Sequence, residues 1–455
     1  MHTNRVTVSF IAILVTVCCL ALGGFASPAA AKTIVVTTLT DTADPPFNAD
    51  GVCGTGTIND LPGADGKVSL REALIAANNT PGADTITFAN GGTIMVTFDD
   101  LDADSDPDPL PALCGGQTRI NGNLNVGHVP DIITLEGRAF PAFPLVAGLV
   151  VLSSHNTIQG LQVQHFPLGI VVAAVGSDTQ VNHTTITGNE VRENGFVGIY
   201  MLSLGDRNVL SHATFARNTV ASNGGVGILI QGGFGGADEN TFEADIKDNI
   251  VTENGFAGIE VLGGVENSSN NHGVARIRGN TVERGHQHQG IGAIAGIGAE
   301  NSPTGTSNNN VLDVRIEQNT VRNQTGEGMY IAAGEGSPDG RPGAVANGNQ
   351  ARVLVEHNTV ENNTAKRIEL DAGSSGLASA NTLDIRVAHN TVCHNTDTAI
   401  LGEGGFSGDA LFPANTGTGN VLTGEIFQNT GTTVVQNGTP GNTATVTQFK
   451  NDPCQ

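Results

Sequence analysis

The chain of 455 residues contains no tryptophan and only two tyrosines, and both scarcities narrow its structural class. Aromatic residues make up 4% of the sequence, whereas glycine occurs 61 times. A large compact core normally draws much of its buried area from aromatic rings. An elongated solenoid needs fewer rings, because every repeat buries similar small aliphatic side chains against its neighbours. The composition therefore favours one elongated body over two or three compact domains.

Basic residues are also scarce. Lysine and arginine together number 21 against 44 aspartates and glutamates, which gives a formal net charge of −23. Binding of nucleic acid needs basic patches, so nucleic acid is not an expected partner, and an anionic membrane surface is disfavoured for the same reason. A strongly acidic secreted protein more often holds cations, or is simply kept soluble by its charge.

Long apolar runs are absent after the first residues of the chain. Arg5 precedes an apolar run from about Val8 to Leu22, which is too short for a comfortable transmembrane helix. The segment SPAAA at 27–31 follows it and has the form of an A-x-A cleavage site. The sequence therefore predicts a secretory signal peptide over residues 1–31, cut after Ala31, a secreted protein and no membrane span.

Cysteine is sparse, and two of the six cysteines fall within the predicted signal peptide. The others are Cys53, Cys114, Cys393 and Cys454. Export permits disulfides. Two of these cysteines lie toward each end of the chain, so Cys53–Cys114 and Cys393–Cys454 are the most economical of the three possible pairings. Each would staple one end of the molecule.

An asparagine recurs in register with buried-type apolar residues. In segments such as IRGNTV and IEQNTV, an apolar residue lies three positions before the asparagine, and in all but the last segment another lies two positions after it. A second asparagine often lies five positions later, followed by a Gly-Ile-like step and a Gly-rich loop of variable length. The repeat asparagines are Asn189, Asn218, Asn249, Asn280, Asn319, Asn358, Asn390 and Asn429.

Each repeat offers three short strands in which inward and outward residues alternate. None is long enough for a sheet of its own, so stacked repeats are predicted to form three parallel sheets around a narrow aliphatic core. The asparagine suits a corner, because it tolerates left-handed backbone and its amide can bond to the asparagine of the next rung. Parallel crossovers are right-handed. The predicted fold class is all-β, a right-handed parallel β-helix or three-sheet solenoid.

Residues 32–145 differ from the repeats and are predicted to form an N-terminal capping segment together with the first rungs. Ser69 and Glu72 have the spacing of a capping box, which predicts a short helix from there to about Asn78. Such a helix could cover the open end of the solenoid, where a bare rung would invite aggregation. The β-helix repeats are predicted over 146–440, and residues 441–455 as a C-terminal tail.

Two segments resemble a known family. VSLREALIAANNTPGADTITF (68–88) resembles the CSLREA domain, found at the start of many exported bacterial right-handed β-helix proteins, and residues 110–137 resemble the segment that follows it. The repeats resemble the pectin-lyase-like superfamily. The resemblance covers nearly the whole mature chain and implies an exported bacterial protein. Val68 stands where the family has a cysteine, so the resemblance leaves Cys114 as the substitute partner for Cys53.

The most acidic run lies at 99–108 and contains Asp102, Asp104 and Asp106 at alternate positions. Alternate carboxylates can converge on Ca²⁺, which takes many oxygen ligands. The glycine that lets such loops turn sharply is missing, so a solvated acidic loop is the favoured interpretation and a calcium site the alternative. Calcium is the one cofactor that the sequence suggests.

Charged residues occupy the outward positions of the strand before each repeat asparagine. Arg276 and Arg278 lie on one rung, and Asp313 and Arg315 on the next. One hypothesis is a groove that grips acidic sugars through the arginines, with carboxylates as acid and base. The favoured alternative is a ladder of opposite charges on a solvated face.

A carboxylate pair gives the candidate catalytic residues. Glu369 and Asp371 are two residues apart on a predicted strand, so they share a face at about 7 Å, a spacing suited to an inverting glycosidase. Arg315 is the third candidate. Any exposed E-x-D strand has this spacing, so a solvated strand is the favoured interpretation. Tyr200 and Tyr330 follow equivalent glycine-apolar steps and are predicted to share an outward column on which a sugar could stack.

The favoured function is binding of polysaccharide or another extracellular polymer by a secreted monomer, without cleavage. One alternative is a polysaccharide lyase or glycoside hydrolase acting on acidic glycans, although the motif series of polygalacturonases and alginate epimerases is not seen. The other alternative is a structural stalk or adhesin. Long Gly-rich loops near 298–309, 333–348 and 402–419 leave one corner of the rung and are predicted to form a rim, where solenoids often place binding residues.

Overall fold

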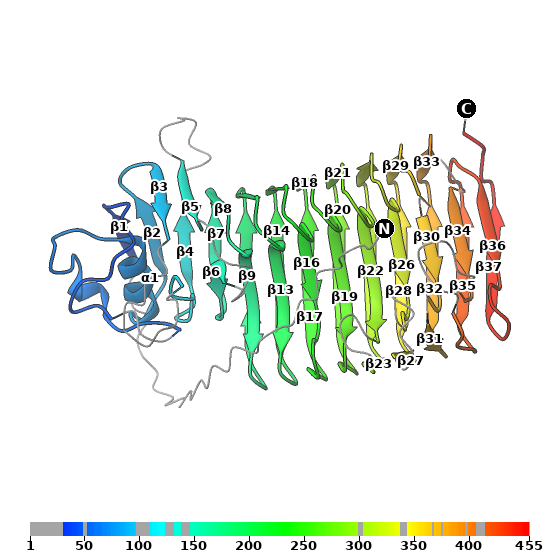
Figure 1. Ribbon diagram of the computed structural model, residues 1–455, viewed down its shortest axis with the longest axis horizontal. Helices are drawn as coiled ribbons and strands as arrows, with labels where there is room; N and C mark the ends of the chain where they lie inside the picture. The colour runs from blue at the N-terminus through cyan, green and yellow to red at the C-terminus, as the bar shows by residue number, and fades with distance from the viewer. Residues whose placement is uncertain are drawn as a thin grey trace.

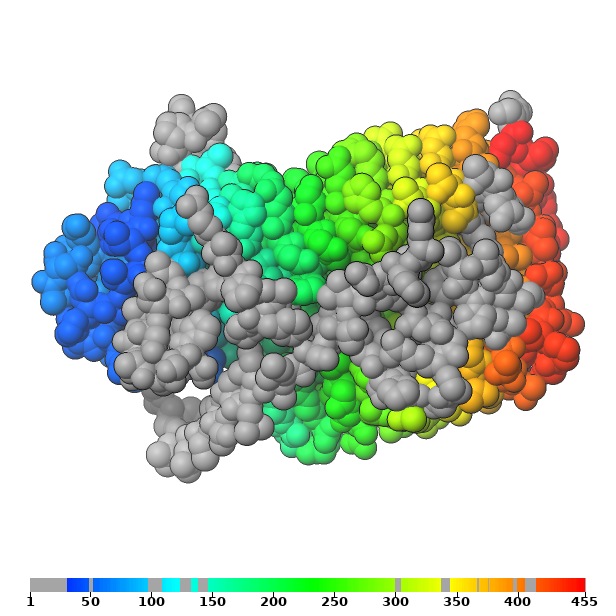
Figure 2. Space-filling view, viewed as in Figure 1, coloured from blue at the N-terminus to red at the C-terminus, as the bar shows by residue number. Residues whose placement is uncertain are grey.

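The computed structural model describes residues 31–48, 52–96, 109–122, 132–137, 146–298, 304–336, 344–365, 368–374, 376–395, 399–405 and 415–454. Over these residues the chain winds into a right-handed parallel β-helix, which confirms the predicted fold class. The rungs follow one another along the long axis in the order of the chain, from the N-terminal strands at one end to β37 at the other (Figures 1 and 2).

Three long sheets make the walls of the β-helix. The first sheet contains β1 (Lys32–Val36), β2 (Asp84–Phe88), β4 (Thr118–Asn121), β7 (Thr157–Gln159), β10 (Gln180–Asn182), β11 (Thr185–Thr187), β14 (Val209–Ala216), β17 (Thr241–Lys247), β20 (His272–Arg278), β24 (Val311–Glu317), β28 (Gln350–Glu356), β32 (Thr382–Ala388), β35 (Val421–Phe427) and β37 (Thr443–Phe449). The second sheet contains β3 (Gly92–Met95), β5 (Ile133–Glu136), β8 (Leu161–Gln164), β12 (Glu190–Arg192), β15 (Thr219–Ala221), β18 (Ile250–Thr252), β21 (Thr281–Glu283), β25 (Thr320–Arg322), β29 (Thr359–Glu361) and β33 (Thr391–Cys393). The third sheet contains β6 (Ala147–Val151), β9 (Leu168–Val175), β13 (Val197–Leu204), β16 (Ile228–Gln231), β19 (Ile259–Val265), β22 (Ile291–Ile297), β26 (Met329–Ala332), β30 (Ile368–Asp371), β34 (Ile400–Glu403) and β36 (Thr433–Gln436).

The core consists of inward-facing aliphatic columns that run from rung to rung. In the first sheet, Ile246 pairs in register with Ile277, Ile277 with Ile316, and Ile316 with Val355, and all four are fully buried. Each such side chain contributes about 1.5–3 kcal/mol through removal from water. Because the same position is filled by a similar aliphatic side chain on most rungs, the core needs few aromatic residues; Phe215, the register partner of Ile246, is one of them.

The repeat asparagines form a buried ladder at the corner between the first and second sheets. From Asn218 onward, the Oδ1 of each accepts hydrogen bonds from the backbone N–H and the Nδ2 of the asparagine one rung before. For Asn280 the donors are the N (2.9 Å) and Nδ2 (3.0 Å) of Asn249. The left-handed backbone lies one residue earlier than predicted, at residues such as Gln318 (φ 57°) and His357 (φ 58°). That residue makes the turn, and the asparagine then points inward.

Two further ladders run parallel to the first. The second contains the predicted asparagines from Asn194 to Asn254. Gln324 then accepts from Gly285 N–H, and its own backbone N–H donates to Asn363 Oδ1. The third lies before the strands of the first sheet and was not predicted. Its members are Asn208, Asn240, Asn271, Asn310, Asn349, Asn381, Asn420 and Asn442.

The N-terminal segment contains the predicted helix, α1 (Leu70–Asn78), and a short 3₁₀ helix, η1 (Ile58–Asp60). Ser69 caps α1 by accepting from Glu72 N–H at 3.1 Å, and Glu72 accepts from Ser69 N–H at 2.9 Å. The fully buried Arg71 donates two 2.9 Å hydrogen bonds to Asp41 and one to the carbonyl of Pro109. The charged residues of the SLREA segment therefore hold the cap together.

A disulfide bond crosslinks the chain near each end of the β-helix. The disulfides are Cys53–Cys114 and Cys393–Cys454, the pairings that the sequence suggested as the most economical. Residues 441–455 are not simply a tail, because β37 pairs in parallel with β35 and adds a strand to the first sheet. Two of the loops predicted to form a rim contain strands, β23 (Thr306–Asn308) and β27 (Val345–Asn347), and these form a small parallel sheet with β31 (Leu377–Ser379).

Candidate functional site

A groove of about 850 Å³ lies on the outer face of the first sheet. Strands β14, β17, β20, β24, β28, β32 and β35 supply its lining, so it crosses seven neighbouring strands along the axis of the β-helix. Its charged residues come from the outward positions of these strands, because inward and outward side chains alternate along a strand. They are Glu243, Asp245, Arg276, Asp313, Arg315, Arg352, Asp384, Arg386 and Glu425, with His212 at one end.

Strand register places these charges in columns. In one column Glu243, Val274, Asp313, Arg352 and Asp384 follow one another on successive rungs. In the next column the order is Asp245, Arg276, Arg315, Leu354, Arg386 and Glu425. The predicted outward arginines and Asp313 therefore do share one face, and this face lines a groove.

Opposite charges pair across rungs at Asp245–Arg278, Asp313–Arg352 and Glu356–Arg386, as the charge ladder predicted. Asp245 accepts from Lys247 Nζ at 2.7 Å and lies 3.3 Å from Arg278 Nη2. Partial burial raises the pKa of Asp245, but the hydrogen bonds from Arg278 and Lys247 outweigh it and lower the pKa overall. Arg352 Nη1 lies 3.6 Å from Asp313 Oδ1.

Opposite charges do not alternate at Arg276 and Arg315. These two arginines are direct register partners on β20 and β24, and both are exposed. The prediction of opposite charges on neighbouring rungs is therefore wrong at this pair. Arg352 completes a run in which β20, β24, β28 and β32 each contribute one arginine to the groove, and it was overlooked although QARVLVE (350–356) has the same alternation as its neighbours.

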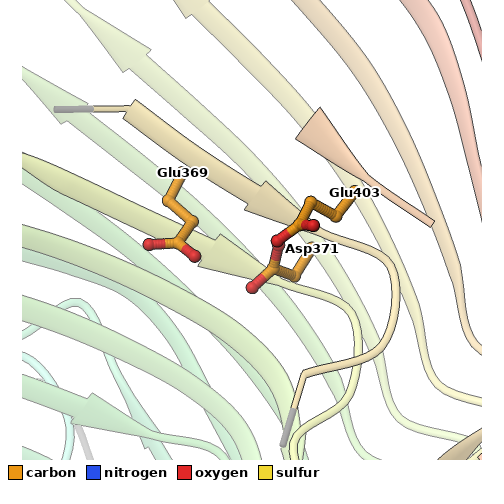
Figure 3. A group of neighbouring side chains, drawn as sticks. All are labelled: Glu369, Asp371 and Glu403. Carbon is orange, nitrogen blue, oxygen red and sulfur yellow. The ribbon is translucent and has the colours of Figure 1, made fainter. Parts of the chain in front are cut away.

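A second cluster of charges lies on the outer side of the third sheet. Glu369 and Asp371 belong to β30, and Glu403 belongs to the neighbouring strand β34, where it is the register partner of Asp371. Carboxylate oxygens of the three residues all lie within 4.8 Å of one another, and all three side chains are buried. The carboxyl groups of Asp371 and Glu403 point toward one another (Figure 3).

The structure corrects the interpretation of Glu369 and Asp371 as a solvated pair. Glu369 is 3% exposed and Asp371 is fully buried. Glu403 was not predicted, although it follows Asp371 by the same 32 residues that separate the ladder residues Asn358 and Asn390. Three clustered carboxylates are oxygen ligands of the kind that divalent cations prefer, so these residues could hold Ca²⁺. Glu403 also accepts a hydrogen bond from Gln436 Nε2.

The predicted tyrosine column exists, but it is not a platform for sugar stacking. Tyr200 and Tyr330 occupy the same outward column of the third sheet, through Leu229, Glu260 and Gly292. Tyr200 is 2% exposed and its hydroxyl donates to Gln231, while the hydroxyl of Tyr330 donates to Ser374. Burial, together with the negative charges of Glu335, Asp371 and Glu369, raises the pKa of Tyr330 well above its usual value, which keeps the hydroxyl a donor.

The three candidate catalytic residues do not form one site. Arg315 lies on the first sheet, whereas Glu369 and Asp371 lie on the third. The predicted calcium ligands Asp102, Asp104 and Asp106 fall outside the described residues. Within the described part of the chain, the group at Glu369 is the one set of three potential metal ligands so closely clustered.

No family model and no curated protein matches the chain. Solved structures similar to it include the Dettilon tailspike protein, with 14% identity and a TM-score of 0.39 over 90% of this chain and 68% of that one. The periplasmic alginate epimerase AlgG has 13% identity and a TM-score of 0.36 over 82% of this chain and 76% of its own. Pectate lyase Pel9A has 13% identity and a TM-score of 0.34 over 91% and 79%. At this level the likeness concerns the β-helix fold alone.

No helix in the described residues has the length and apolar character needed to cross a membrane.

Proposed function

We propose that the protein is a secreted β-helix that binds an extracellular polysaccharide along the outer face of its first sheet. The observation that carries this proposal is the groove, which crosses seven strands and presents charged side chains on each rung from β17 to β35. Rungs repeat at about 4.8 Å, so equivalent donors and acceptors recur along the axis at short, regular intervals. A repeating polymer is the ligand that such a surface suits.

The chemistry of the groove also suits sugar hydroxyls. Arginine side chains donate and carboxylates accept, so a hydroxyl can be engaged in either role. Among the described residues that line the groove there is no tryptophan, tyrosine or phenylalanine, so recognition would rest on hydrogen bonds and charge instead of ring stacking. Two disulfides support passage through an oxidising compartment, consistent with the predicted signal peptide.

The test is affinity electrophoresis or pull-down of the disulfide-bonded protein with a panel of insoluble and soluble polysaccharides. Arg352 and Asp384 are register partners in the groove, and replacing both by serine removes one charge of each sign. We expect this double variant to lose most of its binding. Arg322 and Glu361 are register partners on the second sheet, outside the groove, so the same double replacement there is the matched control. Equal binding by both variants would contradict the proposal.

A second candidate function is cleavage of an acidic glycan at Glu369, Asp371 and Glu403. The observation that favours it is the convergence of three buried carboxylates within 4.8 Å, a set that could hold a divalent cation or act as acid and base. Its test is release of reducing ends or unsaturated products from acidic polysaccharides, with Ca²⁺ and with a chelator. Activity that Glu403→Gln abolishes would establish cleavage, and inactivity on the whole panel would leave binding as the function.

A further inference from the structure

The pair Arg276–Arg315 places two like charges directly opposite one another on neighbouring strands. The two residues are register partners in the middle of two seven-residue strands, so neither strand can shift to separate them without moving the whole rung. Like charges in directly opposed positions destabilise a sheet. Strand register therefore brings two positive charges to neighbouring positions in the groove.

Neighbouring carboxylates do not neutralise the pair. Asp245 precedes Arg276 in the column, but it is engaged by Lys247 and Arg278. Asp313 lies two residues before Arg315, but its contacts are with Arg352 and His272, each at 3.6 Å.

The position after Arg315 in the column is Leu354, which carries no charge. Among the described residues no carboxylate lies within ion-pair distance of Arg276 or Arg315, whereas Arg278, Arg352 and Arg386 each have such a contact. The two central arginines of the groove are therefore available to a ligand.

We propose that Arg276 and Arg315 form the anion subsite of the groove and bind an acidic group of the polysaccharide, a carboxylate or a sulfate. This inference rests on the proposed function and assigns the chemical class of its ligand. Two guanidinium groups on adjacent rungs present planar forks of N–H donors, which match the oxygen pairs of carboxylates and sulfates. A bound anion would also remove the repulsion between the two arginines.

The surroundings of the pair restrict how densely the ligand is charged. Five carboxylates line the same groove as the four arginines, and the chain as a whole carries a formal charge of −23. Toward β17, a polymer with an anion on every unit would meet Glu243 on the first rung past Arg276. Toward β35 it would pass Arg352 and then meet Asp384 and Glu425. The ligand class that fits is a glycan in which acidic sugars are separated by neutral ones. Nucleic acid, with a phosphate on every nucleotide, does not fit.

The experiment measures binding of four probes to the wild type and to Arg276→Gln and Arg315→Gln. Hyaluronan carries one carboxylate per disaccharide, keratan sulfate carries sulfate without carboxylate, polygalacturonate carries a carboxylate on every sugar, and dextran is neutral. We expect hyaluronan or keratan sulfate to bind more tightly than polygalacturonate and dextran. Whichever of the two binds tighter identifies carboxylate or sulfate as the anion. Each variant should weaken that binding about tenfold or more.

Arg322→Gln is the control, because Arg322 is a strand arginine on the second sheet, outside the groove, and pairs with Glu283 at 2.8 Å. It should leave binding unchanged. A second readout separates a binding role from a structural one: Arg315→Gln should keep or raise the melting temperature without ligand, since it removes like-charge repulsion.

The outcomes separate the two proposals. Binding of dextran and acidic probes with equal affinity, unchanged in both arginine variants, would overturn the anion subsite while leaving polysaccharide binding intact. Failure of every polysaccharide to bind would remove the proposed function itself. Tightest binding to polygalacturonate would overturn the assignment of a sparsely charged glycan. A melting temperature lowered by Arg315→Gln, with binding unchanged, would show that the pair is structural.

Discussion

Asn280→Ala tests the asparagine ladder at its centre. Asn280 is 1% exposed, and its Oδ1 accepts from the backbone N–H of Asn249 at 2.9 Å. Its Nδ2 donates to the carbonyl of Ile246 at 2.9 Å and to Oδ1 of Asn319 at 3.0 Å. Alanine would leave the N–H of Asn249 buried without this acceptor, at about 1–3 kcal/mol, and the other lost bonds bring the expected loss of stability to about 3 kcal/mol.

Repeat proteins can unfold in parts, so the assay should be local. Hydrogen exchange of peptides spanning 246–252 reports on the Asn249 amide directly, and a loss of about 3 kcal/mol corresponds to roughly a hundredfold faster exchange. Gln350→Ala is the control, because it removes an exposed amide from β28. If Asn280→Ala and Gln350→Ala changed exchange and urea midpoint equally, the ladder would not stabilise the corner as argued here.

Two further predictions concern buried carboxylates. Burial raises the pKa of the Asp84 carboxyl, although the backbone hydrogen bond and the charge of Lys32 oppose this shift. The carboxyl therefore holds its proton more tightly in the folded state than in the unfolded state, where the pKa of an aspartate is about 3.9. The stability of the folded state should therefore fall as the pH rises from about 4 through the pKa of Asp84 in the folded protein. Asp84→Asn should raise the melting temperature at pH 7 but not at pH 3. An equal effect of the substitution at pH 7 and at pH 3 would contradict this prediction. At Glu403, Ca²⁺ should raise the melting temperature of the wild type and not of Glu403→Gln. Equal shifts in both proteins would mean that calcium binds elsewhere.

Sequence periodicity was sufficient to predict the architecture of the β-helix. The repeat asparagines lie in register with core residues such as Ile277 and Ile316, so one pattern specified strands, corners and stacking together. The helix α1 was also predictable, because the capping box at Ser69 is a local signal that lies within a few residues of the sequence. The third ladder was missed although the sequence carries its signal: from Asn240 to Asn420, each of its asparagines lies nine residues before an asparagine of the first ladder.

The candidate sites were less predictable, because they depend on whether the outward face of each sheet is exposed to solvent or buried by other parts of the chain. The outward columns of the first sheet were assigned correctly, and the groove that contains them follows from strand register. On the third sheet, alternation placed Glu369, Asp371 and both tyrosines outward, but it could not show that this outward face is buried. Glu403 follows Gly402 in a short apolar segment, and only the pairing of β34 with β30 brings it to Asp371.

The most direct test of the account is a crystal structure of the protein with a hexasaccharide fragment of the tightest-binding probe. The account predicts sugar density along the outer face of the first sheet, with an acidic group between the guanidinium groups of Arg276 and Arg315. Density instead beside Glu369, Asp371 and Glu403 on the third sheet would contradict it and would move the function to that carboxylate cluster.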